Sequence, residues 1–294
     1  METSNQIVIN GKTRLCGVIG NPVEHTLSPD IHNTLANACG INLAYAPFFV
    51  EKGGLEAAIK GAFALNVLGI NVTVPYKQDV IAHLEDIDPL AKAVESVNTL
   101  VRTGNGYKGY NTDMSGLYRA MLDDDVVLEN EQVILLGAGG VGRAVAYLCA
   151  AKGAAHVWLL NRSADKAEQI AKEVNAKCGR ECVTAMGLDG WKELSGQKYL
   201  AIQATSVGLH PDSDRAIVED RAFYQMLHTG YDLIYKPAET KFMKLCKAAG
   251  ANAYNGLKML VFQGVEAFEL WNNVTVSKEQ AMRIYEMLSQ KTAV

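Results

Sequence analysis

Short apolar runs alternate with helix-like segments along the first hundred or so residues of the chain. Apolar runs bounded by polar or glycine-containing stretches indicate buried strands, and apolar residues that recur every three or four positions indicate helices packed on them. The pattern predicts strands at Arg14–Gly20, Tyr45–Val50 and Gly69–Val74, with helices at Ser28–Ala38 and Leu55–Leu65.

Two local signals refine this first region. Ser28 is expected to cap the first helix, with Pro29 at the first helical position, because both residue types favour those places. Val97–Arg102 and Tyr107–Tyr110 flank the sequence Thr-Gly-Asn-Gly. Since Asn-Gly favours a tight turn, these two segments are expected to form a hairpin.

A different repeat begins near Met114, with shorter strands and helices in regular alternation. Repeated strand–helix–strand units favour parallel pairing through right-handed crossovers, so this region is expected to form a doubly wound sheet. The predicted strands are His156–Leu160, Lys198–Ala204, Gly230–Ile234 and the fully apolar Gln132–Leu136, and the predicted helices are Arg143 to about Lys152 and Ser163–Asn175.

The last part of the chain has a helical pattern at Gly256–Trp271 and again from Ser277 to the end. Because the repeating unit is already complete by then, these helices are expected to return to the first domain. The expected fold class is therefore α/β with two domains. Residues 1–113, completed by 258–294, would form a substrate-binding domain, and residues 114–257 a Rossmann-type dinucleotide-binding domain.

Composition narrows the classes of partner. The chain has 294 residues and a formal net charge of −4, which argues against nucleic acid as a main partner because phosphate binding needs a basic excess. No apolar run approaches the roughly 20 residues needed to span a membrane, and Met1–Thr13 lacks a signal core. Six scattered cysteines favour reduced thiols in the cytoplasm and no structural metal. A homodimer is compatible with the sequence, which does not determine the oligomeric state.

The strongest single motif is Gly137-Ala138-Gly139-Gly140-Val141-Gly142, which follows a strand and opens a helix. In a dinucleotide-binding loop, Gly137 allows the tight turn, Gly139 lets the backbone approach a pyrophosphate, and Gly142 permits close helix packing. The amides at the helix start attract the phosphates. An ordinary glycine-rich turn is the alternative interpretation.

The residues after the next strand indicate which dinucleotide binds. An acidic residue about 20 positions beyond the glycines would bond the ribose of NAD. Here the sequence is Asn161-Arg162-Ser163, followed by Asp165 and Lys166. Arg162 and Lys166 offer cationic donors to the 2′-phosphate of NADP, so NADP is favoured. Asp165 is the competing NAD-type candidate, and solvated helix-start charges are the alternative.

The first domain carries three polar signals of its own. Thr26 and Ser28 place hydroxyls beside a helix start, where they could hold a carboxylate or merely cap the helix. Lys77 follows a strand end, where α/β proteins hold ligands, although a lone lysine there is usually solvated. Asp113 leads out of the hairpin and, taken alone, would be a turn or cap residue.

Taken together, these segments resemble the shikimate dehydrogenase family over nearly the whole chain. The matching motifs are Gly20–Pro29, Asn71–Lys77, Val97–Thr99, Asn111–Asp113, the glycine loop, Asn161–Ser163, Ala204–Ser206, Tyr231–Asp232 with Tyr235, and Gly256 followed by Met259–Val261 and Gln263. The resemblance implies reversible NADPH-dependent reduction of 3-dehydroshikimate to shikimate, a step of chorismate and aromatic amino acid biosynthesis.

The resemblance also implies residue roles. Thr26 and Ser28 would hold the substrate carboxylate, and Lys77 with Asp113 would be the catalytic pair, Asp113 also binding a hydroxyl. The further substrate contacts would be Thr73, Asn98, Tyr235 and Gln263. On the cofactor side the implied residues are Gly137, Ala138, Gly139, Gly140 and Val141 at the pyrophosphate, Asn161, Arg162, Ser163 and Lys166 at the adenosine phosphate, Thr205, and Leu233 and Gly256 at the nicotinamide.

Hydride delivery to a ketone creates alkoxide character on its oxygen, which needs a positioned donor. Lys77 could transfer a proton or serve mainly as a polarising charge, and the sequence leaves both open. Thr26 replaces the serine of many family members, which bears on whether quinate fits. Two alternatives therefore remain: a quinate/shikimate dehydrogenase with broader substrate and cofactor use, and a non-catalytic NADP-binding regulator. A two-domain folate dehydrogenase would lack the Thr26/Ser28 motif.

Overall fold

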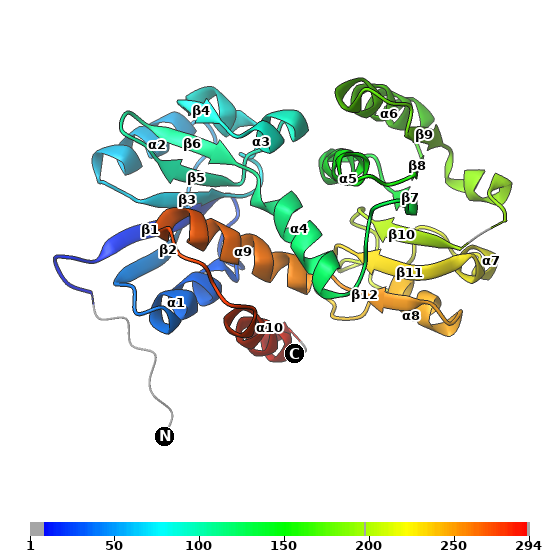
Figure 1. Ribbon diagram of the computed structural model, residues 1–294. Helices are drawn as coiled ribbons and strands as arrows, with labels where there is room; N and C mark the ends of the chain where they lie inside the picture. Colours follow the sequence, from blue (N-terminus) through cyan, green and yellow to red (C-terminus); the bar gives the residue numbers. More distant parts are fainter. Residues whose placement is uncertain (1–8, 197, 293–294) are drawn as a thin grey trace. The chain divides into compact units, whose positions relative to one another are not determined.

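The computed structural model describes residues 9–196 and 198–292, and the chain forms two compact units (Figure 1). Among the described residues, the first unit comprises 9–116 and 260–288, and the second comprises 117–259 and 289–292. The boundaries fall inside three helices, α4 (Thr112–Asp123), α9 (Leu257–Asn272) and α10 (Lys278–Thr292). The expectation of no signal core concerns Met1–Thr13, of which residues 1–8 lie outside the described part, as do the last two residues of the final predicted helix.

The first unit is built on a mixed six-stranded sheet in the order β2-β1-β3-β5-β6-β4. β1 pairs in parallel with both β2 and β3, whereas β5 and β6 form an antiparallel hairpin beside β3, as the Asn-Gly turn predicts. The strands are β1 (Arg14–Gly20), β2 (Leu43–Phe49), β3 (Gly69–Val72), β4 (Asp86–Ile87), β5 (Thr99–Arg102) and β6 (Tyr107–Tyr110).

Helices cover this sheet with apolar faces. Its core on one side joins β1 and β3 to α2 (Leu55–Ala64) through buried side chains that include Ile19, Ile59 and Ile70. The other helices here are α1 (Ser28–Ala38), the 3₁₀ helix η1 (Asp79–His83), α3 (Pro89–Val94) and α10 (Lys278–Thr292), together with α9.

The capping prediction for α1 is wrong. Its N-cap is Leu27, which makes no side-chain capping bond, and Ser28 is already helical. The reason is local, because the Thr26 side chain in the preceding turn accepts the backbone N–H of Ser28 through its Oγ1 atom. The Ser28 hydroxyl is thereby left for other partners.

The second unit contains six parallel strands in the order β12-β11-β10-β7-β8-β9, which confirms the predicted doubly wound sheet. Strand order reverses between β7 and β10, which is where such sheets hold nucleotides. The strands are β7 (Gln132–Leu136), β8 (His156–Leu160), β9 (Val183–Met186), β10 (Tyr199–Gln203), β11 (Leu227–Asp232) and β12 (Asn252–Tyr254).

The helices of this unit are α5 (Gly140–Ala151), α6 (Ala164–Cys178), the 3₁₀ helix η2 (Leu188–Glu193), α7 (Arg221–Gln225) and α8 (Lys241–Ala248). α5 begins at Gly140, three residues before the predicted start, because the glycine loop itself enters the helix. Several elements were not predicted, namely η1, β4, α3, α4, β9, η2, α7, α8 and β12. All of them except α4 and α8 have six residues or fewer, too few to display a clear period in the sequence.

One contact between distant segments holds the first unit together. Trp271 of α9 lies against Gly69 of β3, and its indole Nε1–H donates to the backbone oxygen of Leu100 at 2.9 Å. A Cβ atom at Gly69 would overlap the Trp271 ring, so the strand needs glycine at this position. The packing of α9 on the sheet therefore depends on a residue with no side chain.

We expect Gly69→Ala to lower the free energy of unfolding by about 1–3 kcal/mol, the usual cost of overpacking a core. The measurement is urea denaturation at neutral pH. Gly61→Ala is the matched control, since Gly61 lies within α2 with open space around it and should gain roughly 0.5–1 kcal/mol. A Gly69→Ala protein as stable as the parent would contradict this account of the packing.

Candidate functional site

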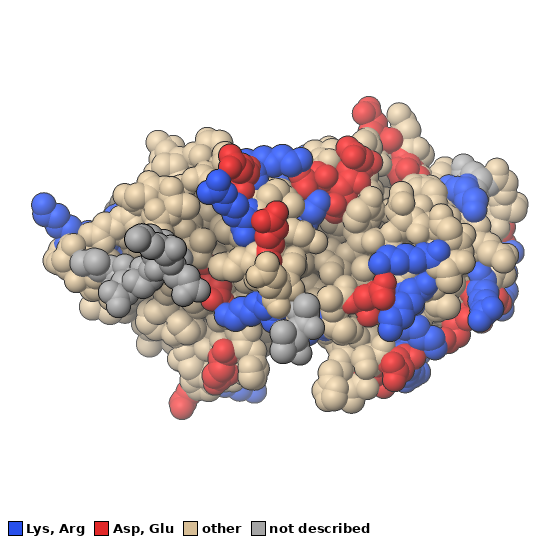
Figure 2. Space-filling view, turned by 90° about the horizontal axis from the view of Figure 1, so that it is seen from below, with Lys and Arg blue, Asp and Glu red and all other residues tan. Residues whose placement is uncertain are grey.

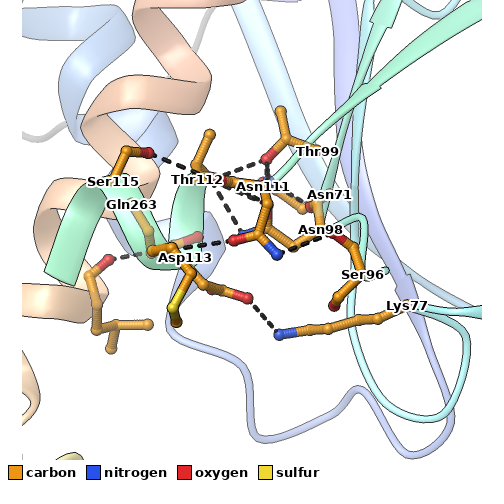
Figure 3. Close-up of polar contacts among 12 residues, drawn as sticks. Asn71, Lys77, Ser96, Asn98, Thr99, Asn111, Thr112, Asp113, Ser115 and Gln263 are labelled. Atoms are coloured by element: carbon orange, nitrogen blue, oxygen red, sulfur yellow. Dashed lines mark hydrogen bonds and ion pairs between the residues drawn. The ribbon is translucent and has the colours of Figure 1, made fainter. Parts of the chain in front are cut away.

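Lys77 and Asp113 form an ion pair in the first unit. Lys77 Nζ lies 2.7 Å from Asp113 Oδ2, and the two side chains are 32% and 19% exposed. Figure 3 shows them pointing toward each other below a cluster of asparagine and threonine side chains. The pair is thus reachable by a ligand yet partly shielded from water, which strengthens its electrostatic interaction.

Lys77 is placed by the loop that follows β3. The Tyr76 ring is buried, its hydroxyl donates to the backbone oxygen of Val50, and the backbone N–H of Val97 donates to the Lys77 oxygen. These contacts tie both sides of Lys77 to the sheet. Its side chain therefore leaves a fixed backbone, and the interpretation of Lys77 as a merely solvated lysine does not describe this structure.

Asp113 is placed by the residues just before it. Asn111 Oδ1 accepts the backbone N–H of Met114, which caps α4, and Asn111 Nδ2 donates to the Ser96 oxygen. Asn98 Oδ1 accepts the backbone N–H of Thr112 at 2.7 Å. Because Asn111 is the capping residue, the Asp113 carboxylate is not used as a cap and pairs with Lys77 instead.

Two hydroxyls gather at the end of β1. Thr26 Oγ1 donates to Ser28 Oγ at 3.1 Å, and both residues are partly buried. Thr73, just beyond β3, packs its methyl group against Gly20, and its backbone N–H donates to the Ile19 oxygen. The loop after β1 and the loop after β3 therefore lie side by side at the carboxyl ends of neighbouring strands.

Gln263 belongs to α9, near the C-terminal end of the chain. It is 8% exposed, and its Nε2 donates to the Leu260 oxygen one turn earlier. Gly116 of α4 lies directly against the Gln263 backbone, where any Cβ would overlap it. The glycine thus permits the close approach of α4 and α9 that brings Gln263 and Asp113 into one region (Figure 3).

The second unit contains a pocket of about 670 Å³ at the carboxyl ends of β7, β8 and β10. Gly137 has φ of +110°, a conformation that L side chains rarely adopt, and a Cβ at Gly142 would overlap the Gly137 oxygen. A Cβ at Gly139 would meet nothing within 4 Å, so the backbone there is open to a ligand. This loop fits the pyrophosphate of a dinucleotide.

Asn161 connects the glycine loop to the end of β8. Its Oδ1 accepts the backbone N–H of Ala138 at 3.2 Å, and its Nδ2 donates to the Ser163 oxygen at 3.0 Å. Asn161 thereby holds both edges of the pocket in position. Among the predicted cofactor residues, those that line the pocket are Gly137, Ala138, Gly139, Asn161, Arg162, Lys166 and Thr205.

The pocket also contains a cation that the sequence did not single out. Arg215 lines it together with Arg162 and Lys166, and its Nη1 lies 3.8 Å from Asp212 Oδ1. Asp165, the competing NAD-type candidate, is exposed and does not line the pocket. The arrangement of three cations suits a ligand with an additional phosphate. Arg215 lies in a long irregular loop, where the sequence has no periodic pattern from which the direction of its side chain could be predicted.

The other predicted residues of the second unit lie apart from that pocket's lining. Gly256 packs on the Leu233 backbone and its N–H donates to the Ile234 oxygen, so Leu233 and Gly256 are neighbours. Tyr235 follows in the same loop and is partly buried, and burial raises its pKa. The roles of these three residues, and of Gly140, Val141 and Ser163, stay predictions.

The loop after β11 is anchored by the carboxyl group of Asp232, a residue of the family motif with no predicted role. Asp232 is fully buried and accepts hydrogen bonds from the Thr240 hydroxyl at 2.6 Å and from the Ile234 backbone N–H at 3.0 Å. Burial raises the pKa of Asp232 to about 6. The residue shapes the segment that carries Leu233 and Tyr235.

Charge elsewhere on the molecule is mixed. Figure 2 shows acidic and basic side chains interspersed on the face it draws. Within residues 9–196 and 198–292, no group of three or more His, Cys, Asp or Glu side chains is arranged to hold a metal ion. Nor does any helix in these ranges combine the length and apolar character needed to cross a membrane.

A doubly wound unit with an open glycine loop and a cationic pocket, joined in one chain to an α/β unit with a Lys–Asp pair, defines the class of nicotinamide-dependent oxidoreductases. Comparison with known proteins specifies the family. The substrate binding domain of shikimate dehydrogenase matches residues 18–100, shikimate / quinate 5-dehydrogenase matches 120–206, and the C-terminal domain of shikimate 5′-dehydrogenase matches 256–283. The chain belongs to the shikimate dehydrogenase family.

Individual relatives agree with this assignment. The NADP⁺ shikimate dehydrogenase of Carboxydothermus hydrogenoformans is 41% identical over 268 residues, which is 91% of this chain and 94% of that protein. A chorismate mutase/shikimate 5-dehydrogenase fusion protein from Clostridium acetobutylicum superposes with a TM-score of 0.87 at 30% identity, covering 96% of this chain and 99% of the other. A shikimate dehydrogenase solved with NADP⁺ gives 0.86 at 34%, covering 96% and 97%.

We expect Arg162→Ala and Arg215→Ala each to weaken NADPH binding by about tenfold or more, since each removes a charge-assisted hydrogen bond to phosphate. NADH binding should change far less. The measurement is a fluorescence titration of each reduced cofactor, with Lys172→Ala as control, because Lys172 lies on α6 but outside this pocket. Equal losses for NADPH and NADH would show that the arginines contact another part of the cofactor.

Proposed function

We propose that this protein catalyses the reversible reduction of 3-dehydroshikimate to shikimate with NADPH. The observation that carries the proposal is the Lys77–Asp113 ion pair, which lies near Asn98 (Figure 3) in a unit that matches the substrate binding domain of shikimate dehydrogenase. NADP⁺-dependent relatives at about 40% identity over nine-tenths of the chain support the cofactor.

The chemical requirement is a positive group at the ketone oxygen. When bound, NADPH supplies the hydride that reaches the carbonyl carbon. As that bond forms, negative charge develops on the oxygen, and a hydrogen bond from Lys77 Nζ stabilises it or delivers the proton that completes the alcohol. Asp113 Oδ2 accepts from the same ammonium group at 2.7 Å and so holds it in place. In the reverse direction the proton leaves toward Lys77.

The remaining side chains of the first unit would hold the substrate. Thr26 and Ser28 present two hydroxyls that can donate to the carboxylate, which has four acceptor lone pairs to satisfy. Asn98, Thr73 and Gln263 would meet the ring hydroxyls. Orienting a small ring at both ends places its carbonyl at Lys77, and such positioning supplies a large part of a rate enhancement.

The cofactor would occupy the pocket of the second unit. The amides of Gly139 and Gly140, at the start of α5, would receive the pyrophosphate, and Arg162, Lys166 and Arg215 would surround the 2′-phosphate. Such an enzyme serves chorismate biosynthesis. We expect it in the cytoplasm, which is consistent with six free cysteines, and we retain the homodimer as a proposal to be measured by light scattering.

The first test is to offer the purified protein shikimate or quinate, each with NADP⁺ or NAD⁺, and to follow the absorbance of the reduced nicotinamide. We expect rapid reduction with shikimate and NADP⁺ and much slower reduction with the other three pairs. Comparable rates with quinate or NAD⁺ would assign the protein to a broader-specificity branch. Tight NADPH binding without turnover of any pair would leave a non-catalytic cofactor-binding protein.

Replacing Lys77 with methionine removes the charge while keeping the aliphatic length. We expect Lys77→Met to lower kcat by about 10²-fold or more, the usual contribution of a positioned proton donor, with a small change in KM. NADPH affinity is the control, because Lys77 belongs to the other unit. A variant that binds shikimate and keeps most of its kcat would exclude the assigned role.

A further inference from the structure

A buried histidine lies behind the substrate side of the first unit. His32 of α1 has no exposed surface, and its ring stacks on Tyr45 at 4.2 Å and lies 4.9 Å from the Trp271 ring. Its Nε2 lies 3.1 Å from Asn71 Oδ1. Its Nδ1 has no hydrogen-bond partner within the described part of the chain, which is unusual for a fully buried nitrogen.

The direction of the hydrogen bonds around Asn71 follows from chemistry. Asn71 Nδ2 lies 3.2 Å from the backbone oxygen of Asn98 and 3.0 Å from Thr99 Oγ1. A backbone oxygen can only accept, so the amide nitrogen must face it and Oδ1 must face the opposite side. There Oδ1 accepts from the Tyr45 hydroxyl at 2.7 Å and from His32. His32 therefore carries its hydrogen on Nε2.

The protonation of His32 agrees with that assignment. Burial lowers the pKa of the imidazole to about 3, so the ring is neutral at physiological pH. A neutral imidazole has one N–H and one bare nitrogen. With the hydrogen on Nε2, the bare nitrogen is the Nδ1 that lacks a partner, and the ring acts as a fixed single donor to Asn71.

The same chain of hydrogen-bond donors and acceptors extends to Asn98. Since Thr99 Oγ1 accepts from Asn71, its own hydrogen points to Asn98 Oδ1 at 3.1 Å or to Thr112 Oγ1 at 2.9 Å. The backbone N–H of Thr112 also donates to Asn98 Oδ1. Oδ1 of Asn98 is thus committed to donors of the protein, and Nδ2 donates one hydrogen to Thr112 Oγ1 at 3.0 Å. Its second hydrogen can be offered to a ligand oxygen.

We propose that His32 is a positioning residue for substrate recognition: through Asn71 and Thr99 it supports the same Asn98 orientation that the Thr112 backbone N–H favours, with an amide N–H toward the substrate. This inference rests on the proposed function, because it takes Asn98 to contact the substrate. Without this support the Asn98 amide would be held less firmly, and its hydrogen bond to the substrate oxygen would be weaker. The relay therefore selects substrates that place a hydrogen-bond acceptor at Asn98.

His32 offers a cleaner test than its neighbour Tyr45. The Tyr45 hydroxyl also hydrogen-bonds the Ser28 side chain, so its removal would disturb the carboxylate end of the site as well. His32, in contrast, hydrogen-bonds Asn71 alone within the described residues. Thr99 gives an independent variant on the same relay, since Thr99→Val removes the hydroxyl and keeps the shape.

The experiment compares His32→Leu, which has no donor, with His32→Gln, whose amide nitrogen can stand near the place of Nε2. We expect His32→Leu to raise KM for shikimate about tenfold, the effect of removing one of the two donors to the buried Asn71 Oδ1. Its kcat and NADPH affinity should change by less than about threefold, and His32→Gln should return KM toward the parent value. Thr99→Val should raise KM similarly, and the double variant should be no worse than either single variant.

The outcomes separate this inference from simpler ones. A lowered melting temperature with unchanged KM in both His32→Leu and Thr99→Val would overturn it and leave His32 a packing residue. Additive increases in KM for the two substitutions would also overturn it, because two residues that act through the same chain of hydrogen bonds should not have independent effects. If His32→Leu fails to fold, the KM of Thr99→Val tests the relay. ¹⁵N NMR of the parent imidazole tests the tautomer of His32, and a hydrogen on Nδ1 instead of Nε2 would refute the proposal. A parent protein without turnover would refute the proposed function instead.

Discussion

The first unit depends on the Asn98 side chain, which lies between the hairpin and the first turn of α4. Its Oδ1 accepts the backbone N–H of Thr112, and its backbone oxygen accepts from Val72 of β3. One residue therefore connects the end of β3, the start of β5 and the start of α4. Asp113 follows Thr112 directly, so this junction helps to fix the backbone from which the carboxylate meets Lys77. Removing the amide would leave buried backbone groups unpaired, which is costly.

The second unit uses a similar device at its own strand ends. Asn161 Oδ1 accepts the backbone N–H of Ala138, and Asp232 accepts from Ile234 and Thr240. In each case a polar side chain at a strand end satisfies backbone groups of the next loop. Loops fixed in this way lose less conformational freedom when a ligand binds, which favours affinity. Asparagine suits the role because it donates and accepts without introducing charge.

Most of the architecture could be predicted because it depends on periodic patterns. β1, α1, β7 and β8 have the bounds that hydrophobic alternation and apolar runs indicate. The Asn-Gly turn between β5 and β6 and the glycine loop before α5 are equally local signals. The prediction that Ser28 caps α1 was wrong, because the Thr26 side chain accepts the backbone N–H of Ser28. It missed β4 and β12, whose two and three residues carry no measurable period.

For the candidate site, the sequence by itself determined the residue types and their order, through local motifs whose spacing is a property of the chain. The tertiary structure decided which of them meet. Lys77 and Asp113 are 36 positions apart, and Arg215 lies far along the chain from Arg162, so only sheet order brings them together. The direction of each hydrogen bond around Asn71 also depends on side chains from α1, β2 and β5. Such proximity arises from long-range packing, which leaves no periodic trace in a sequence.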